Sequence, residues 1–169
     1  MQNSEIFQNS IRFIGLALLQ VLVLNHINFL GYVNPYLYIT FVLLFPFTGN
    51  RTLLIFLGFL LGLTIDMFSD TGGIHAAATV LIAYIRPALL KFTFGLSYEY
   101  NVIKLNQAPI KERLLYISGM VLIHHLVLFL LETFNISHIL LALKSTLFSS
   151  IFSILLIFCS IILWGRKRS

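Results

Sequence analysis

The sequence predicts an all-α integral membrane protein, built as a compact bundle of about six transmembrane helices. Of the 169 residues, 59% are hydrophobic and only 10% are charged, whereas a soluble domain carries roughly 25% charged residues. Six acidic and eleven basic side chains cannot cover the surface of a soluble protein of this size. The net charge of +5 does not indicate nucleic-acid binding, because the basic residues stand at the ends of apolar runs instead of on one polar face.

The apolar runs give the expected spans within a single domain, residues 1–169. A helix needs about 20 residues to cross a hydrocarbon core of about 30 Å. The expected spans cover residues 11–30, 36–48, 52–68, 74–90, 114–131 and 139–164. The second run has only thirteen residues and carries Pro46. Two alternatives therefore stay open for this run: it crosses as a short sixth span, or it dips into the membrane and returns.

The positions of the basic residues predict the orientation of the chain. With both termini in the cytoplasm, ten basic residues lie on or near the inner side: Arg12, Arg51, Arg86, Lys91, Lys104, Lys111, Arg113, Arg166, Lys167 and Arg168. Only Lys144 then lies outside, in agreement with the positive-inside tendency. The five-span alternative, with the N-terminus outside, places nine basic residues inside and two outside. The C-terminus is cytoplasmic in both arrangements.

Residues 91–113 form the expected cytoplasmic loop. From Phe92 to Val102, apolar and polar residues alternate with a period of two, which is typical of extended chain. We expect this segment either to lie at the headgroup level with its aromatic rings in the interface, or to serve as a docking strand for a cytoplasmic partner.

A stripe of small residues runs along the third expected span. Gly58, Gly62 and Asp66 follow at intervals of four and therefore share one helix face. Small residues on such a face let a second helix approach closely. We expect the fourth span to supply that helix, because His75 and Thr79 begin a matching stripe with the same interval.

Asp66 needs a partner, because an ionisable side chain at the centre of a span costs about 2.5–3.5 kcal/mol. We expect His75 to meet it across the turn that contains Gly73, and Asp70 to cap that turn. One carboxylate and one imidazole are too few ligands for a closed metal site. The sequence therefore predicts a structural pair, with no metal and no cofactor.

The remaining polar residues give no sign of an enzyme. His124 and His125 lie mid-span and point about 100° apart on a helix, so we expect hydrogen bonds between helices. The single cysteine, Cys159, excludes an intramolecular disulfide. No G-x-S-x-G, H-E-x-x-H or phosphate-binding glycine loop occurs.

Residues 62–76 read GLTIDMFSDTGGIHA. This stretch, together with the short proline-containing second run and the order of the spans, resembles the MreD family across nearly the whole chain. The resemblance implies a non-enzymatic scaffold of the rod-shape (elongation) complex in the bacterial cytoplasmic membrane. Its expected partner is the bitopic protein MreC, and it would act indirectly with MreB, RodA and a cell-wall transpeptidase. Asp66, Gly73 and His75 match the characteristic stretch of the family.

Two other functions stay open. The MreD family is similar in fold to the substrate-binding subunits of energy-coupling-factor vitamin transporters, which implies a small-molecule transporter subunit as the alternative. That reading needs a polar pocket open to the outer side, which we expect to involve Asn25, His26, Asn28, Asp66 and His75. Such subunits carry an Ala-x-x-x-Ala motif in the first helix, where this chain has the single alanine Ala17. A membrane enzyme that uses Asp66 and His75 is the third reading.

Overall fold

The computed structural model describes residues 2–29, 31–46, 49–95, 105–134 and 138–165, and this part of the chain forms helices and no strand. The α-helices are α1 (Gln2–Leu22), α2 (Thr40–Leu44), α3 (Arg51–Ser69), α4 (Ile74–Phe94), α6 (Ile110–Thr133) and α7 (Ile139–Gly165). Three 3₁₀ turns complete the list: η1 (Leu24–His26), η2 (Leu37–Ile39) and η3 (Leu105–Gln107). Five helices of the described chain, all except α2, are long and apolar enough to cross a membrane.

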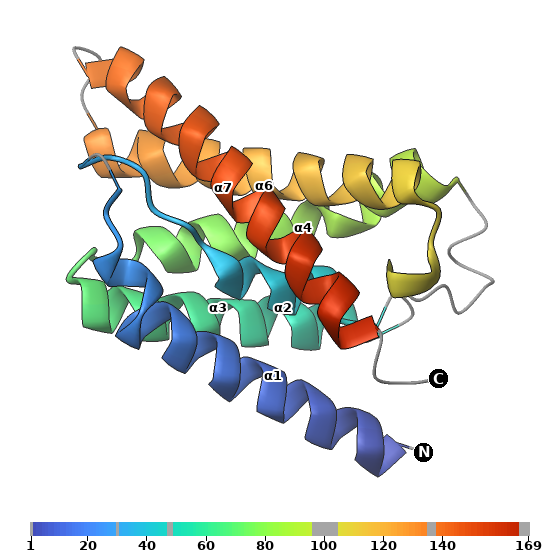
Figure 1. Ribbon diagram of the computed structural model, residues 1–169. Coiled ribbons are helices and arrows are strands. Elements are labelled where there is room, and N and C mark those ends of the chain that lie inside the picture. The colour runs from blue at the N-terminus through green and yellow to red at the C-terminus, as the bar shows by residue number, and fades with distance from the viewer. Residues whose placement is uncertain (1, 30, 47–48, 96–104, 135–137, 166–169) are drawn as a thin grey trace.

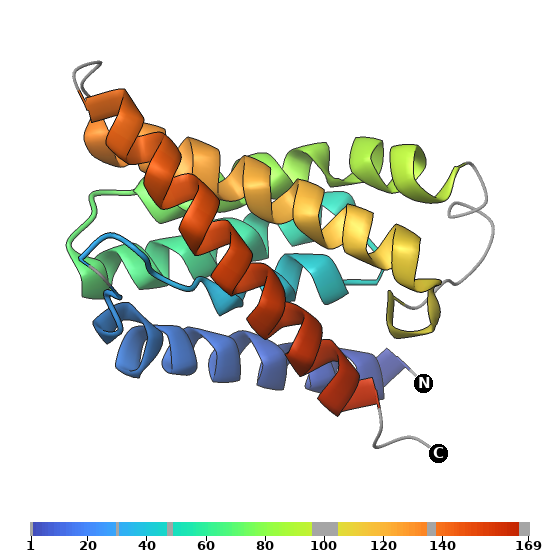
Figure 2. The ribbon, with the colours of Figure 1, turned by 45° about the horizontal axis from the view of Figure 1, so that its top comes forward.

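The helices run side by side in one bundle. Figures 1 and 2 show α3 beside α4 and α6 beside α7, with α1 packed along α3. Helix α1 begins and α7 ends at the same end of the bundle, which we call the proximal end (Figure 1). At the opposite, distal end, α1 ends, α3 turns into α4, and α6 ends. The fold is therefore that of a multi-pass membrane protein with an interior of its own.

The first helix is displaced from its expected position. It begins at Gln2 instead of residue 11 and ends at Leu22 instead of residue 30. Polar residues extend a helix readily once its end has left the hydrocarbon, so hydropathy marks its start too late. After Leu22 the chain turns through η1, and Asn28 and Gly31 adopt positive φ angles of 30° and 79°. This turn directs the chain back into the bundle.

The second apolar run is the centre of the molecule. It forms η2 and the five-residue helix α2, and it leads from the distal to the proximal end between the longer helices (Figures 1 and 2). Tyr38, Ile39, Val42 and Leu43 have no exposed surface. The described part of the run does not fold back on itself, and its one α-helix, α2, has only five residues. The run passes through the protein interior.

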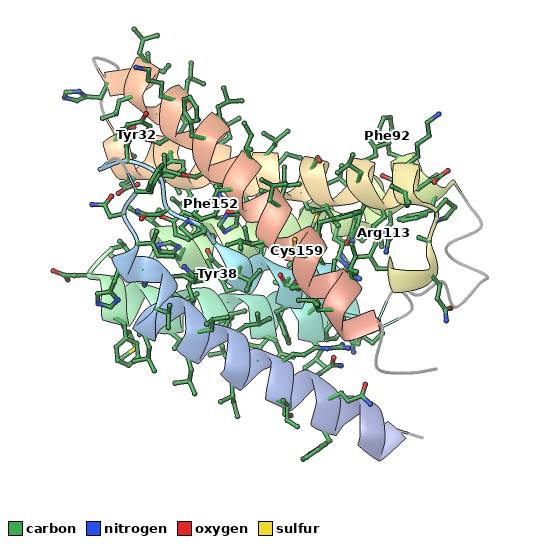
Figure 3. All side chains as sticks on the ribbon, viewed as in Figure 1. Tyr32, Tyr38, Phe92, Arg113, Phe152 and Cys159 are labelled. Carbon is green, nitrogen blue, oxygen red and sulfur yellow. The ribbon has the colours of Figure 1, made fainter. Side chains whose placement is uncertain are left out.

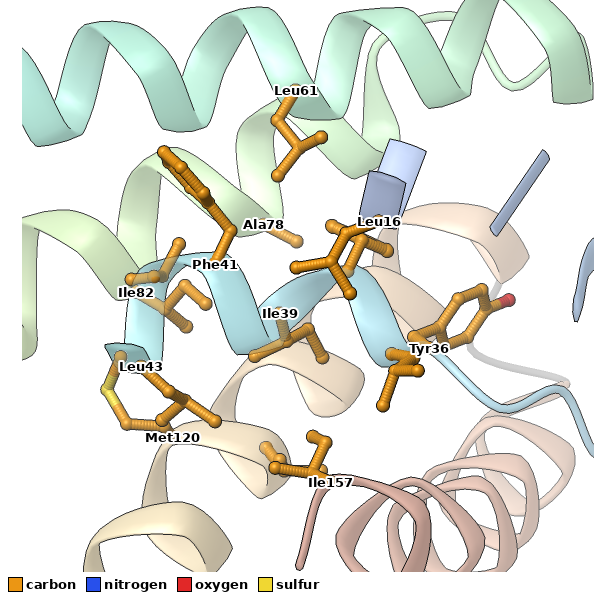
Figure 4. Packing of buried hydrophobic residues seen from close by; sticks show 14 of the residues in the cluster. Leu16, Tyr36, Ile39, Phe41, Leu43, Leu61, Ala78, Ile82, Met120 and Ile157 are labelled. Carbon is orange, nitrogen blue, oxygen red and sulfur yellow. The ribbon is translucent and has the colours of Figure 1, made fainter. Parts of the chain in front are cut away.

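We call η2 and α2 together (residues 37–44) the central segment. Every long helix contributes side chains to the shell around it. Figure 4 shows Ile39, Phe41 and Leu43 among Leu16 of α1, Leu61 of α3, Ala78 and Ile82 of α4, Met120 of α6 and Ile157 of α7. Because the segment is largely apolar, it has no polar face to offer to water, and the long helices enclose it.

Two helices extend further at the proximal end than expected. Helix α4 continues past residue 90 to Phe94 and ends at Gly95, whose φ of 68° suits glycine. Helix α6 begins at Ile110, directly after Pro109. Phe92 is therefore helical and points away from the bundle (Figure 3), so the expected extended segment is wrong at its start. The rest of that segment, residues 96–102, lies outside the described residues.

Candidate functional site

The hairpin of α3 and α4 is built on a very close helix contact. A Cβ atom placed on Gly62 would lie 2.5 Å from the Cα atom of Ala76 and 2.7 Å from the carbonyl oxygen of His75. At Gly58 the nearest atom, Cγ2 of Thr79, would be 3.4 Å away. The expected packing of the glycine stripe against the fourth span is confirmed. Because α4 covers this face, the stripe is an internal contact and not a free surface for a partner.

Asp66 ties the start of α4 to the end of α3. Its Oδ1 atom accepts hydrogen bonds from the backbone N–H of His75 (2.9 Å) and from the hydroxyl of Thr71 (2.5 Å). Its Oδ2 atom accepts from the backbone N–H of Ala76 (2.8 Å). The first N–H groups of a helix lack partners within the helix, and a carboxylate there also interacts favourably with the positive end of the helix dipole. The partner expected for Asp66 is thus the right residue, but its backbone makes the bond and not its imidazole.

The turn between these helices depends on backbone conformation. Asp70 ends α3 in the left-handed region (φ 54°, ψ 42°), and its backbone N–H bonds to the carbonyl of Asp66. Gly72 and Gly73 follow with φ of 63° and 100°. Asp70 therefore caps α3 through its backbone, since no hydrogen bond joins its side chain to another described residue. Gly73 supplies the conformation that lets α4 begin at once.

Three buried histidines lie around the central segment. The hydroxyl of Tyr38 is 3.0 Å from Nδ1 of His75 and 2.7 Å from Nε2 of His124, so it joins α4 to α6. Tyr38 lies well inside the bundle in Figure 3. The expected hydrogen bonding between helices is confirmed, but the tyrosine at its centre was not anticipated. The available signal was a tyrosine hydroxyl within a mainly apolar run, because a buried tyrosine usually finds a polar partner.

His125 makes a separate connection to α7. Its Nδ1 atom is 2.9 Å from the carbonyl oxygen of Val121, which requires a proton on that nitrogen. In the neutral ring Nε2 is then an acceptor, and Ser153 donates to it over 3.0 Å. The Ser153 oxygen also accepts the backbone N–H of Tyr36 at 2.9 Å. Within the described residues, no three histidine, cysteine or carboxylate side chains are grouped for a metal ion.

Polar side chains also satisfy the irregular backbone that enters the bundle before η2. Gln20 of α1 accepts the N–H of Leu37 (2.9 Å) and donates to the carbonyl of Pro35 (3.0 Å). Ser149 of α7 accepts the N–H of Asn34 at 3.1 Å. Non-helical chain at membrane depth needs such partners, because no water is available there. Composition alone does not reveal these contacts.

At the proximal end, Arg86 binds the end of the central segment. Its Nε donates to the hydroxyl of Tyr116 at 3.0 Å, and its terminal nitrogens donate to the carbonyls of Phe45 and Pro46. The carbonyls at the end of a helix lack partners and carry partial negative charge, so a cation is favourable there. Arg86 was expected only as a topology signal, and it is a buried structural residue.

A polar cavity of about 260 Å³ opens at the distal end. We call it the distal cavity, and its lining residues are Asn25, His26, Asn34, Tyr36, Phe68, Ser69, Thr71, Ile74, His75, Leu128 and Glu132. Of the residues expected to form an outer pocket, Asn25, His26 and His75 are present, whereas Asn28 and Asp66 are not among the lining residues. Asn25 also donates to the hydroxyl of Ser69 at 2.7 Å, so this hydrogen bond between two lining residues joins η1 to the end of α3.

Helix lengths, buried polar contacts and the distal cavity together define a multi-pass helical membrane protein. Comparison of the chain with protein-family models, with curated proteins and with solved structures gives no match.

Proposed function

We propose that this chain is a non-enzymatic membrane scaffold of the bacterial elongation complex, which binds MreC and helps to direct lateral peptidoglycan synthesis and cell shape. MreB, RodA and a cell-wall transpeptidase are its indirect partners. The observation that supports the proposal most is the set of hydrogen bonds between the polar groups of residues 62–76. Asp66, Thr71 and the start of α4 bind one another, so the stretch that resembles MreD builds a fixed hairpin.

A pull-down of the tagged, detergent-solubilised protein tests this proposal. Mass spectrometry of the eluate is expected to recover MreC together with other proteins of wall elongation. Recovery of paired ATPase subunits and a transmembrane coupling protein instead would contradict the scaffold function.

Crosslinking from single positions would show which helix meets MreC, a bitopic protein that crosses the membrane once. Suitable positions are exposed residues on each long helix: Leu18 of α1, Phe56 of α3, Tyr84 of α4, Leu122 of α6 and Leu155 of α7. A photoreactive residue at one of them, or at two on neighbouring helices, is expected to capture MreC. The matched control is Leu61, which has no exposed surface. Equal capture at Leu61 would mean that the adducts come from unfolded protein.

The enzymatic reading finds little support in the geometry of its two residues. Both carboxylate oxygens of Asp66 accept backbone N–H groups, and Nδ1 of His75 faces Tyr38. Neither group is arranged to pass a proton to the other. We expect stably expressed Asp66→Asn and His75→Ala variants to keep cell-shape function, and a complete loss of function in well-folded variants would revive the catalytic reading.

A small-molecule transporter subunit is the second candidate, and the distal cavity is the observation that favours it. Polar residues converge there from η1, α3, α4 and α6 and from the segment before η2. A stoichiometric small molecule in the purified protein, found together with ATPase subunits in the pull-down, is the outcome expected for this function. MreC without any such ligand would exclude it.

A further inference from the structure

The distal cavity has a distinctive charge. Glu132, at the exposed end of α6, is the one carboxylate among the lining residues, and neither lysine nor arginine lines the cavity. A lone carboxylate attracts a cation electrostatically.

Hydrogen-bond capacity is left over inside the cavity. Oδ1 of Asn34 is buried and has no hydrogen-bond partner within the described residues. His75 is 4% exposed; Tyr38 occupies its Nδ1, and no described residue bonds to its Nε2. Leaving a buried polar atom unpaired costs about 1–3 kcal/mol. An acceptor at Asn34 and a carboxylate at Glu132 both call for a donor.

The aromatic lining suits the same type of ligand. The rings of Tyr36 and Phe68 line the cavity, and Tyr36 is itself buried and packs edge-on against His75 with ring centroids 5.3 Å apart. Aromatic faces attract organic cations through the ring quadrupole. The volume of about 260 Å³ lies just below the roughly 300–1,000 Å³ of common ligand pockets, so the ligand has to be compact.

We propose that the distal cavity binds a primary ammonium group on a compact organic cation, with Glu132 as the counter-charge and Asn34 as a hydrogen-bond acceptor. Two sources share this chemistry: a soluble small amine and the ethanolamine headgroup of a phospholipid. The inference goes beyond the scaffold function and does not depend on it. It also specifies the ligand class for the transporter alternative, and that part rests on the alternative being correct.

The direct test is calorimetric titration of the full-length protein in nanodiscs made of phosphatidylcholine and phosphatidylglycerol, which contain no primary amine. The buffer has to lack primary amines as well. Ethanolamine is expected to bind saturably. Choline, which has no N–H donor, and ethylene glycol, which has no charge, are expected to bind at least about tenfold more weakly. Absence of saturable ethanolamine binding, together with absence of retained phosphatidylethanolamine in the cell-purified protein, overturns the proposal.

Matched variants show whether Glu132 is responsible. Glu132→Gln is expected to weaken ethanolamine binding about tenfold or more, and Glu132→Asp is expected to retain most of it. The control is Glu112→Gln, which makes the same change near the start of α6 and outside the cavity. Thermal unfolding of each variant identifies any that fail to fold. Equal affinities in well-folded Glu132→Gln and Glu112→Gln proteins overturn the proposal.

The two sources are separated by native mass spectrometry of the protein purified from cells. Retained phosphatidylethanolamine that disappears in Glu132→Gln identifies the lipid headgroup. Saturable ethanolamine binding that persists in nanodiscs containing phosphatidylethanolamine, with no lipid retained, identifies a soluble amine. Both results are independent of the protein pull-down, so failure of this inference and failure of the scaffold function can be told apart.

Discussion

Two glycines of this molecule have very different amounts of space around them. At Gly62 the backbone of α4 is so near that even a methyl group has no room, whereas at Gly15 of α1 no atom lies within 4 Å of an added Cβ. The same residue type thus reports a close contact in one helix and an open surface in another. A pattern of small residues becomes informative only when a second helix has a matching face.

We predict that Gly62→Ala destabilises the protein by about 1–3 kcal/mol, because the helices have to move apart. Gly15→Ala is the matched control and is expected to be neutral or slightly stabilising, since alanine is the better helix former. Thermal unfolding of the purified proteins, followed by fluorescence-detected size-exclusion chromatography, measures both. Similar melting temperatures for the two variants would contradict the close packing of α3 and α4.

Tyr38→Phe tests the polar connection in the core. Removal of the hydroxyl leaves Nδ1 of His75 and Nε2 of His124 without their partner, at a cost of about 1–3 kcal/mol. Tyr84→Phe makes the same change on the exposed side of α4 and is expected to leave stability within about 0.5 kcal/mol of the parent. Chemical denaturation in detergent compares the two variants, and a stable Tyr38→Phe protein would show that the hydroxyl contributes little.

At the scale of elements, helix α7 stabilises the central segment through serines. Ser153 accepts the N–H of Tyr36 and bonds to His125, whereas Ser160 bonds only within its own helix. We therefore expect Ser153→Ala to lower stability by about 1–3 kcal/mol and Ser160→Ala to have little effect. Hydrogen exchange at the Tyr36 amide gives a local readout. It should accelerate in Ser153→Ala alone, and unchanged protection would argue against this contact.

The α3–α4 hairpin could be predicted closely from the sequence, and the expected boundaries of α3 are within one residue of those observed. The reason is that small residues with a period of four and a glycine turn are local signals. The central segment was less accessible. Hydropathy reports how apolar a run is, and not whether lipid or protein surrounds it. The bonds from Tyr38 to residues 37 and 86 positions away, and the cavity itself, arise only once the helices are assembled.

At the scale of the whole molecule, both ends of the described chain lie at the proximal end, together with the start of α3. The predicted cytoplasmic location of that end can be tested by labelling. In a Cys159→Ser background, Asn50→Cys is expected to react with a membrane-impermeant maleimide only after the cells are opened, and Asp70→Cys in intact cells. Both positions are exposed. The reverse pattern would invert the orientation, and equal reactivity would contradict opposite ends.

The central segment has a consequence for biosynthesis. It leaves the ribosome before four of the five long helices, so at that moment it lacks most of its shell, and of the polar groups that hold its entry only Gln20 precedes it. The serines that accept the Asn34 and Tyr36 amides belong to the last helix made. The central segment therefore cannot reach its final packing at the time it is synthesised. The arrival of α7 closes the assembly, and a chain truncated before it is expected to be recognised as unfinished and degraded.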